Sequence, residues 1–523
     1  MPTQYIWYTK MIYYNGNIKE IHYNGYTIRK IFSCGGSLVW SGGTTPPTPT
    51  GYRCILVNDL DETYNSECDG TELQMAPYLY HQDGNMADIR DYFNNNYVTS
   101  ITIGDCVETI GMYAFSDYAS VSWNHIQNTD DVKTISISDS VKTIEEFAFY
   151  RIKNFTALNL GNSVETIGNS AFGNAYSLRS LTIPNSVKTI EGAAFAIDNS
   201  IGAHSSLTSL TLGNSVETIG NSAFARHSLI QHITIPSSVT SIGDSAFAEC
   251  SRLQEIEIPN NVTTMNSNAF KDCTSAKYAI ISSGLSGVSS SAFENCTSLS
   301  AVTMPNTINS IDSQAFKGCT SLHSFTLPNR TREIGFAAFS GCTSLSSFTF
   351  NNRIQTLGAR AFQGCTSIKE IILPDSLTTL STASSSSTEN GVFQGCSSLS
   401  ALTIGNGLST LPSNTFKGCC IENIIIPDNI TSIGAEVFRD NTNCKVIDLG
   451  TNIATIGSSS LLMYNNQMEA IIVRSTIPPN GTGSCGKYNN APIYVPDDSV
   501  EDYKTANGWS EYADRITPIS EKP

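Results

Sequence analysis

The sequence predicts a repeat solenoid that is preceded by a small antiparallel β-meander. Three observations support this fold class. An Ala-Phe dipeptide or a close variant recurs along most of the chain, a short alternating apolar run precedes it, and Asn-Gly turns separate apolar-polar runs near the N-terminus. A chain of 523 residues would otherwise suggest three or four domains, at roughly 150 residues each. A repeat array makes that division unnecessary.

The first 97 residues contain three segments. In residues 5–40, Asn15-Gly16, Asn24-Gly25 and Gly35-Gly36 separate alternating runs, which predicts a meander of about four strands within an anchoring module, residues 1–40. Residues 41–51, SGGTTPPTPTG, form a Gly, Thr and Pro linker. We expect residues 52–97 to form an N-terminal cap, with a short helix over ADIRDYFNNN (87–96) and a solvated acidic loop over residues 59–70.

The repeat array is predicted over residues 98–473 and is defined by its phenylalanine. Six successive intervals, from Phe224 to Phe362, are 23 residues each, and intervals of 34, 29 and 31 residues indicate one repeat with an inserted loop. The dipeptide ends at Phe115, Phe149, Phe172, Phe195, Phe224, Phe247, Phe270, Phe293, Phe316, Phe339, Phe362, Phe393, Phe416 and Phe438.

One unit, SLTSLTLGNSVETIGNSAF, illustrates the local structure. Leu207, Leu210 and Leu212 alternate as in a short strand, and Gly213-Asn214 ends it. The V-x-x-I-G run that follows is a second short extended piece, and the S-x-A-F turn carries the largest apolar side chain of the unit. One unit cannot bury these side chains alone, so neighbouring units must stack, at about 4.8 Å per unit.

Three segments resemble the BspA-type leucine-rich repeat family: LTSLTLGNSVETIGNSAF, IQHITIPSSVTSIGDSAF and FRDNTNCKVIDLG. The resemblance covers roughly residues 98–520, because IYVPDDSVEDYKTANGWSEYADRITPI is similar to the C-terminal cap of such arrays, here residues 474–523. It implies a parallel sheet that lines one face of a curved solenoid, binding roles in adhesion, and no catalytic residues. The predicted fold class is therefore a leucine-rich-repeat-like parallel β-solenoid with a small N-terminal meander. The meander is similar to N-terminal modules of virion proteins from phages that infect gut Bacteroidales.

Eight cysteines share one repeat position, three residues after the phenylalanine. A metal or redox array is one interpretation of them, and a ladder of small buried side chains is the other. We favour burial, because parallel side chains about 4.8 Å apart do not point toward each other as a disulfide requires. The ladder consists of Cys250, Cys273, Cys296, Cys319, Cys342, Cys365, Cys396 and Cys419.

One strand position carries a ladder of threonines that is predicted to face one side of the solenoid. This ladder is either a solvated surface of a β-favouring residue or part of a binding face. Glu257 interrupts it, as do Ile280, Ile372, Ile425 and Asp448. Binding candidates on this side are Glu257, Tyr278, Thr303, Thr326 and Thr349.

Insertions supply the other binding candidates. Extra residues follow Phe115 and Phe195 at the same point of the repeat, so they should project from one edge. The first insertion contains Tyr118, Trp123 and His125, an aromatic and polar set that suits a contact patch or a sugar platform, although a tolerated surface loop is the alternative. We expect the ligand contact on this insertion edge rather than on the threonine ladder.

The sequence does not predict an enzyme or a cofactor. It contains no H-E-x-x-H or G-x-S-x-G motif, and G-T-G-S-C-G at residues 481–486 lacks the strand and helix of a dinucleotide site. A weaker alternative places an enzymatic site in residues 52–97. The formal charge of −16 argues against a nucleic-acid partner, and no apolar run is long enough to span a membrane.

The function predicted from these features is recognition or adhesion. We expect a virion fibre or accessory protein of a phage that presents the repeats to a host-surface protein or glycan. Residues 1–40 would attach it to a neighbouring virion or surface protein, and the oligomeric state is left open. The alternative is a bacterial cell-surface adhesin of the same repeat family.

Overall fold

A computed structural model describes the strands within residues 11–88 and then residues 98–523, except residues 106, 117–128, 199–203, 383–390, 462–466 and 482–489. The chain divides into two compact units, Met1–Ile190 and Glu191–Pro523. Each unit is described by itself. No helix among these residues is both long enough and apolar enough to cross a bilayer.

The N-terminal meander is present. Strands β1 (Met11–Tyr14), β2 (Asn17–Tyr23) and β3 (Tyr26–Ile28) form one antiparallel sheet in the order β1-β2-β3. Two residues separate each strand from the next, as the two Asn-Gly pairs predict. The rest of residues 5–40, which includes the predicted fourth strand, lies outside the described residues.

Residues 52–88 add antiparallel strands to the first repeat strand. The order β9-β4-β5-β7-β8 joins β4 (Tyr52–Asn58), β5 (Thr63–Glu67), β7 (Tyr78–Tyr80) and β8 (Met86–Asp88) to β9 (Val98–Ile103). The helix predicted over residues 87–96 is wrong at Ala87 and Asp88, because they pair with β7, and its other residues are not described. The loop predicted over residues 59–70 is likewise wrong at 63–67, since pairing with β4 makes them a strand.

The parallel sheet that the resemblance implies is present, and most repeats contribute a longer strand to it and a shorter strand to a second sheet. The repeat at residues 231–242 contributes only the shorter strand. In Met1–Ile190 the longer strands β9, β11 (Thr134–Ile137) and β13 (Ala157–Asn159) pair in parallel. The shorter strands β6 (Glu72–Leu73), β10 (Thr109–Ile110), β12 (Thr143–Ile144), β14 (Thr166–Ile167) and β16 (Thr189–Ile190) form a second parallel sheet. The two sheets enclose the core between them.

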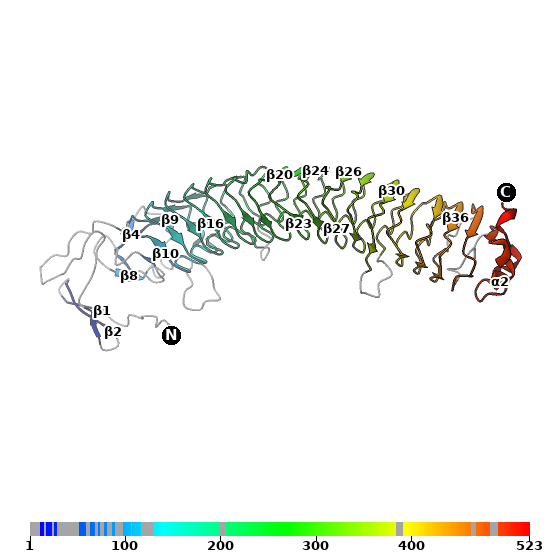
Figure 1. Cartoon of the computed structure of the whole chain (residues 1–523). Coiled ribbons are helices and arrows are strands. Elements are labelled where there is room, and N and C mark those ends of the chain that lie inside the picture. The colour runs from blue at the N-terminus through cyan, green and yellow to red at the C-terminus, as the bar shows by residue number, and fades with distance from the viewer. Residues whose placement is uncertain are drawn as a thin grey trace. The chain divides into compact units, whose positions relative to one another are not determined.

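Glu191–Pro523 repeats this arrangement, and its strands follow one another in chain order (Figure 1). Its longer strands are β17 (Ser209–Thr211), β20 (Glu255–Ile258), β22 (Tyr278–Ile281), β24 (Ala301–Thr303), β26 (Ser324–Thr326), β28 (Ser347–Thr349), β30 (Glu370–Leu373), β32 (Ala401–Ile404), β34 (Asn423–Ile425), β36 (Val446–Leu449) and β38 (Ala470–Val473). Its two-residue strands are β18 (Thr218–Ile219), β19 (Ser241–Ile242), β21 (Thr264–Met265), β23 (Gly287–Val288), β25 (Ser310–Ile311), β27 (Glu333–Ile334), β29 (Thr356–Leu357), β31 (Thr379–Leu380), β33 (Thr410–Leu411), β35 (Ser432–Ile433) and β37 (Thr455–Ile456).

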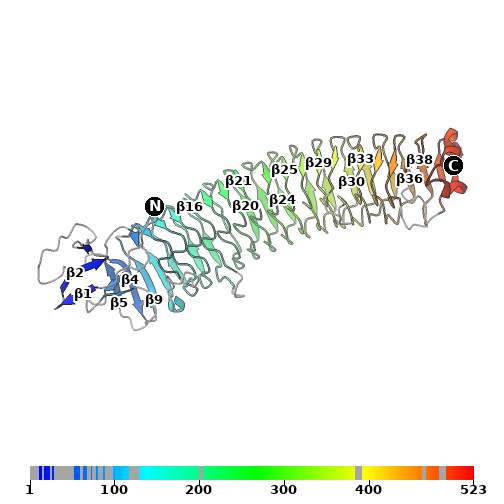
Figure 2. The same cartoon turned by 90° about the horizontal axis from the view of Figure 1, so that it is seen from below.

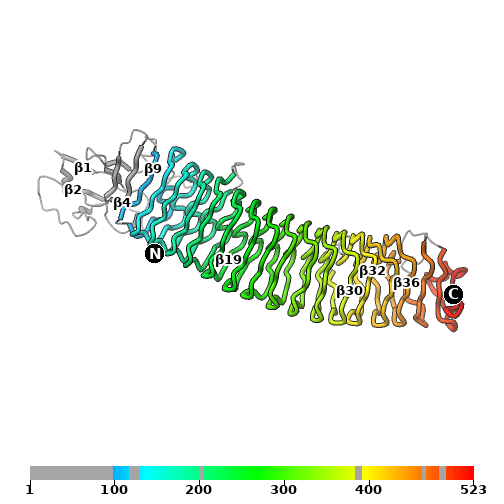
Figure 3. Tube along the Cα trace, turned by 90° about the horizontal axis from the view of Figure 1, so that it is seen from above, coloured from blue at the N-terminus to red at the C-terminus, as the bar shows by residue number. Residues whose placement is uncertain are grey.

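Stacked phenylalanines fill the core of this unit. The Cα trace in Figure 3 shows the successive rungs that carry them. The ring of Phe293 is fully buried, with its centroid 6.0 Å from that of Phe270 and 5.4 Å from that of Phe316. The rings in these pairs are within 7° and 4° of parallel, respectively. This geometry confirms the phenylalanine as the anchor of the repeat.

The turn around most of the phenylalanines depends on left-handed backbone conformations two residues before and two residues after the ring. Around Phe293, Ser291 has a φ of 54° and Asn295 a φ of 58°. Glycine occupies the second position in later rungs, as at Gly341, where φ is 75°. The recurring Gly-Cys that follows the Phe turn in these rungs signals this conformation, and the sequence interpretation above did not use it.

The C-terminal segment closes the stack with short helices, drawn in red in Figure 2. Its elements are β39 (Ile493–Val495), η2 (Asp497–Ser499), α2 (Val500–Thr505), η3 (Ser510–Arg515), β40 (Ile516–Pro518) and η4 (Ile519–Glu521). Tyr503 and Trp509 are fully buried edge to face, and the indole Nε1 of Trp509 donates to the carbonyl of Pro479 at 2.9 Å. Large side chains thus cover the apolar end of the last rungs.

Candidate functional site

The outward side chains of strands β20 to β36 form a continuous surface, which we call the strand face. Outward and inward residues alternate along each strand, and the first inward residue is buried in β26 and β28 and half-buried in β24 and β32. These strands pair in parallel and in register within four successive sheets, β20-β22-β24, β26-β28, β30-β32 and the sheet that begins β34-β36. The repeat places equivalent residues of successive strands in columns. One column is Glu255, Tyr278, Ala301, Ser324, Ser347, Glu370, Ala401, Asn423 and Val446, and the other is Glu257, Ile280, Thr303, Thr326, Thr349, Ile372, Thr403, Ile425 and Asp448.

The predicted threonine ladder lies on this face. Thr303, Thr326 and Thr349 are exposed, and Thr326 lies directly beside Thr349 in the register of β26 and β28. Within the described residues none of these three hydroxyls makes a hydrogen bond inside the protein. The sequence therefore predicted the orientation of the ladder correctly. Whether the ladder binds a ligand stays a prediction.

Glu257 and Tyr278, the two other candidates on this side, lie in a polar cluster at the N-terminal end of the strand face. The hydroxyl of Tyr278 donates a short hydrogen bond to Oε2 of Glu255, on the neighbouring strand. Nδ1 of His232 lies 3.6 Å from the other carboxylate oxygen of Glu255. Glu257 projects from the same strand as Glu255 and lies beside Ile280.

Sequence reasoning missed His232 and Glu255. Both occupy the repeat position of Tyr278, because 23 residues separate His232 from Glu255 and Glu255 from Tyr278. The repeat spacing was therefore the signal that could have found them. The hydrogen bond to Glu255 raises the pKa of Tyr278, because the carboxylate accepts a hydrogen bond from the neutral phenol and its negative charge opposes ionisation of the phenol. Tyr278 therefore stays a hydrogen-bond donor at neutral pH.

Large apolar side chains are exposed at intervals along the same face. The exposed fraction is 36% for Ile280, 56% for Ile372 and 64% for Ile425. All three belong to the column that also carries Thr303, Thr326, Thr349 and Thr403. A β-sheet surface that only faces water has no need for these side chains, so they are candidates for burial against a partner.

The strand face ends where the C-terminal segment covers it. Arg474 makes a two-bonded ion pair with Asp448, with both N–O distances at 2.6 Å. Beyond this pair, Ala470, Ile472 and Tyr494 are buried, and Ile519 packs against them. At this end the C-terminal segment therefore already covers the continuation of the two columns.

The Cys ladder lies in the core and is absent from the strand face. All eight thiols are buried and unpaired by disulfides, which confirms the prediction of burial. Each thiol donates to the carbonyl oxygen of the phenylalanine in the preceding rung, at 3.1 to 3.4 Å. Burial raises the pKa of Cys296 to about 12, so this thiol is not a nucleophile at neutral pH.

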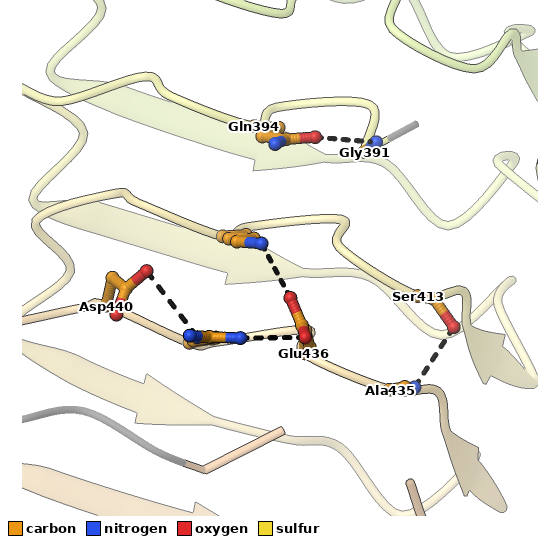
Figure 4. Close-up of polar contacts among 8 residues, drawn as sticks. Gly391, Gln394, Ser413, Ala435, Glu436 and Asp440 are labelled. Atoms are coloured by element: carbon orange, nitrogen blue, oxygen red, sulfur yellow. Dashed lines mark hydrogen bonds and ion pairs between the residues drawn. The ribbon is translucent and has the colours of Figure 1, made fainter. Parts of the chain in front are cut away.

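Charged side chains near the Phe turns join successive rungs. In Figure 4, Glu436 accepts from Nζ of Lys417 at 2.6 Å and from Arg439 at 2.8 Å, and the Ser413 hydroxyl accepts from the backbone N–H of Ala435. These contacts satisfy groups within the stack. They hold the rungs in register.

The insertion candidates Tyr118, Trp123 and His125 lie outside the described residues, so their contacts stay predictions. Among the residues with described side chains, no three His, Cys, Asp or Glu side chains come together as a metal site would require. The strand face is thus the surface on which described, sequence-predicted binding residues gather.

Comparison with known proteins identifies the repeat. The model of the BspA-type leucine-rich repeat region, with six copies, matches residues 88–201, 197–323, 288–388 and 382–482, which together exceed half of the chain. No curated protein sequence matches.

Several solved structures are similar. A leucine-rich repeat protein from Bacteroides ovatus is 21% identical and covers 80% of this chain and 93% of its own, with a TM-score of 0.54, which supports the fold. The pneumococcal vaccine antigen PcpA is 16% identical and covers 89% of this chain and 97% of its own, with a TM-score of 0.35. A leucine-rich cell surface protein from Faecalibacterium prausnitzii is 19% identical and covers 81% of this chain and 95% of its own, with a TM-score of 0.32.

Proposed function

Because this chain belongs to the BspA-type leucine-rich repeat family, we propose that it is a non-enzymatic recognition protein, which binds a host-surface protein or glycan through the strand face. The observation that carries this proposal is the exposure of Ile280, Ile372 and Ile425 at one repeat position of the stacked strands. Burying such side chains against a partner contributes about 25 cal/mol per Å² of apolar area removed from water.

The stacked backbone supports the same role. Parallel strands, Phe rings and ladder hydrogen bonds fix the position of each exposed side chain before any partner arrives. A pre-organised surface loses little conformational entropy on binding, which favours affinity. A recognition surface on this scaffold therefore needs no moving loop.

For the location, we propose a virion fibre or accessory protein of a phage, and a bacterial cell surface is the alternative. The proposal is supported by the order of segments in the sequence: a small antiparallel sheet within residues 1–40, a Gly, Thr and Pro linker, and then the repeats. In this proposal residues 1–40 attach the protein to a neighbouring virion or surface protein. Mass spectrometry of purified phage particles and of bacterial outer-membrane fractions would distinguish the two locations.

The binding proposal is tested by measuring attachment of the full chain to host cells. Thr326→Lys places a charged side chain in the middle of the strand face and should abolish attachment. Thr343→Lys is the matched control, because Thr343 is also exposed but lies in the turn after Cys342. Both variants should melt at the temperature of the parent.

The same assay tests the insertion edge. If Trp123→Ala or removal of residues 118–128 prevented attachment while Thr326→Lys did not, the insertion would be the binding site. If only deletion of residues 1–40 prevented attachment, the meander would be the binding module, and the strand-face proposal would be wrong.

A further inference from the structure

We propose that the strand face contains a subsite for one lysine or arginine side chain of a protein partner, formed by Glu255, Glu257 and Tyr278 with Ile280 beside them. This inference rests on the proposed recognition function and specifies the chemistry of the partner. The subsite lies on β20 and β22, at the N-terminal end of the columns of exposed residues.

Strand geometry places the two carboxylates together. Glu255 and Glu257 are alternate residues of β20, so both side chains leave the same side of the sheet, about 7 Å apart at their Cα atoms. The parallel register then sets Tyr278 beside Glu255 and Ile280 beside Glu257. Two carboxylates, one aromatic ring and one aliphatic side chain therefore surround a single point on the surface.

The charges at this point favour a cation. The Tyr278 hydroxyl holds the carboxylate of Glu255 in place, and His232 flanks it on the preceding rung. Glu257 has no hydrogen bond or ion pair among the described residues. Lys277 is exposed on the same rung as Tyr278, so the two carboxylates outnumber the one lysine at this end of the strand face. An arriving guanidinium or ammonium would find one carboxylate without a partner.

The apolar groups fit the rest of such a side chain. Lysine and arginine carry an aliphatic stem that packs on apolar surface while the charged head bonds to carboxylates. Tyr278 is 44% exposed and Ile280 is 36% exposed, so the ring and the methyl groups are available to the stem. The face of a tyrosine ring also attracts a cation.

The neighbouring rungs favour a protein over a glycan. Strands β24, β26 and β28 present only the short side chains of Ala301, Thr303, Ser324, Thr326, Ser347 and Thr349, on which a partner backbone can lie. Exposed apolar side chains resume at Ile372 on β30, four rungs from β22, or about 19 Å at 4.8 Å per rung. A partner segment with a basic residue at one end and an apolar residue at the other matches this order of acidic, short and apolar side chains along the strand face.

A peptide pair tests the subsite on the full chain. We would measure binding of a fluorescein-labelled nine-residue peptide of threonine and valine with one central arginine, and of the same peptide with citrulline, in 150 mM salt. Citrulline keeps the shape of arginine without its charge. The arginine peptide should bind about tenfold more tightly, the effect of one charge-assisted hydrogen bond.

Variants locate the effect. Glu257→Gln and Tyr278→Ala should each remove the preference for arginine, and Tyr278→Phe should retain most of it because the ring remains. Glu370→Gln is the matched control, since Glu370 is an exposed strand-face carboxylate beside Ala401 and has no aromatic neighbour in its register. This control should bind both peptides as the parent does.

Several outcomes would overturn the subsite. Equal binding of the two peptides, or binding of neither, would contradict it. An equal loss of the arginine preference in Glu370→Gln would also contradict it, because that result would indicate attraction to the net negative charge of the whole chain. If neutral oligosaccharides bound to the strand face and the arginine peptide did not, the ligand of this face would be a glycan. If the peptides were equivalent while Thr326→Lys still abolished attachment, the subsite would be wrong and the proposed function would stand.

Discussion

The thiol of Cys296 donates a hydrogen bond to the carbonyl oxygen of Phe270, 3.3 Å away, and so links one rung to the rung before it. The same bond recurs at every cysteine of the Cys ladder. Two other donors occupy the ladder position in Glu191–Pro523. Nε2 of His227 lies 2.8 Å from the carbonyl oxygen of Phe195, and Nδ2 of Asn441 donates to that of Phe416 at 2.9 Å. This position therefore combines burial with a small or flat hydrogen-bond donor.

The Cys ladder should make the protein sensitive to alkali. Burial raises the pKa of Cys296 from 9.0 to about 12. Below pH 9 the thiol is protonated in the folded and unfolded states, and its contribution to stability is complete. Between pH 9 and about 12 only the unfolded state loses the proton, so the free energy of unfolding falls by up to about 1.4 kcal/mol per pH unit for each such thiol. Urea unfolding from pH 8 to 11 would measure this slope.

Cys296→Ser isolates the contribution of one thiol. The serine hydroxyl keeps a hydrogen-bond donor and does not titrate in this range. The fall of the free energy of unfolding with rising pH should therefore lose the contribution of one thiol. An unchanged slope would show that Cys296 is not held protonated by the fold. At pH 7, thiol reagents should label few ladder cysteines of the native protein and all of them after unfolding.

His227 should make one rung sensitive to acid. Burial lowers its pKa from 6.5 to about 4, and its Nδ1 accepts from the hydroxyl of Ser205 at 2.6 Å. Above pH 6.5 the ring is neutral in both states. As the pH falls from 6.5 to about 4, only the unfolded state takes up the proton, so the free energy of unfolding falls by roughly 1.4 kcal/mol per pH unit.

His227→Cys is the matched variant, because cysteine occupies this position in the next rung at Cys250. It should keep a donor to Phe195 and flatten the stability profile between pH 4 and 6.5. Chemical unfolding at several pH values would compare it with the parent. An equal acid slope in both proteins would contradict the burial of His227.

Phe293→Ala should destabilise the protein by about 3 to 5 kcal/mol, because the ring is fully buried between Phe270 and Phe316 and its removal leaves a cavity. Since each rung contacts mainly its neighbours, the loss should spread to adjacent rungs. Hydrogen exchange should show faster exchange at the amides of β22 to β26 than at those of β36. A melting curve identical to that of the parent would contradict this prediction.

Gly341→Val should destabilise the protein by about 1 to 2 kcal/mol, and Gly341→Asn by much less. The φ of Gly341 is 75°, a conformation that β-branched residues rarely adopt and that asparagine tolerates, as Asn295 does at the same repeat position. A Cβ at Gly341 would meet only Gly318 atoms at 3.9 Å, so lack of space is not the cause. Thermal unfolding of both variants would test this, and equal effects would contradict a backbone origin.

The repeat spacing alone was sufficient to predict most of the core. Every rung places the same repeat position in the same environment, so a 23-residue period with Phe and Cys at fixed offsets fixes which side chains are buried. The alternation of the longer strands likewise predicted that Thr326 faces outward. These inferences needed no knowledge of contacts, because in a stack the neighbour of each residue is its own counterpart in the next unit.

The regions without the period were harder to predict. A helix was expected at Ala87, but pairing with Leu79 makes this residue part of a strand. Tertiary pairing outweighed local propensity there, as it does where a segment completes the edge of a sheet.

The sequence by itself thus determined the solenoid, its buried Phe and Cys ladders and the outward orientation of its threonines. Only the tertiary structure decided which outward residues meet: that Tyr278 bonds to Glu255, that Glu257 lies beside Ile280, and that Ile519 covers the last rungs. The physical reason is that burial follows from the position of a residue within its own repeat. A surface cluster depends on the register between repeats and on side chains that differ from one repeat to the next.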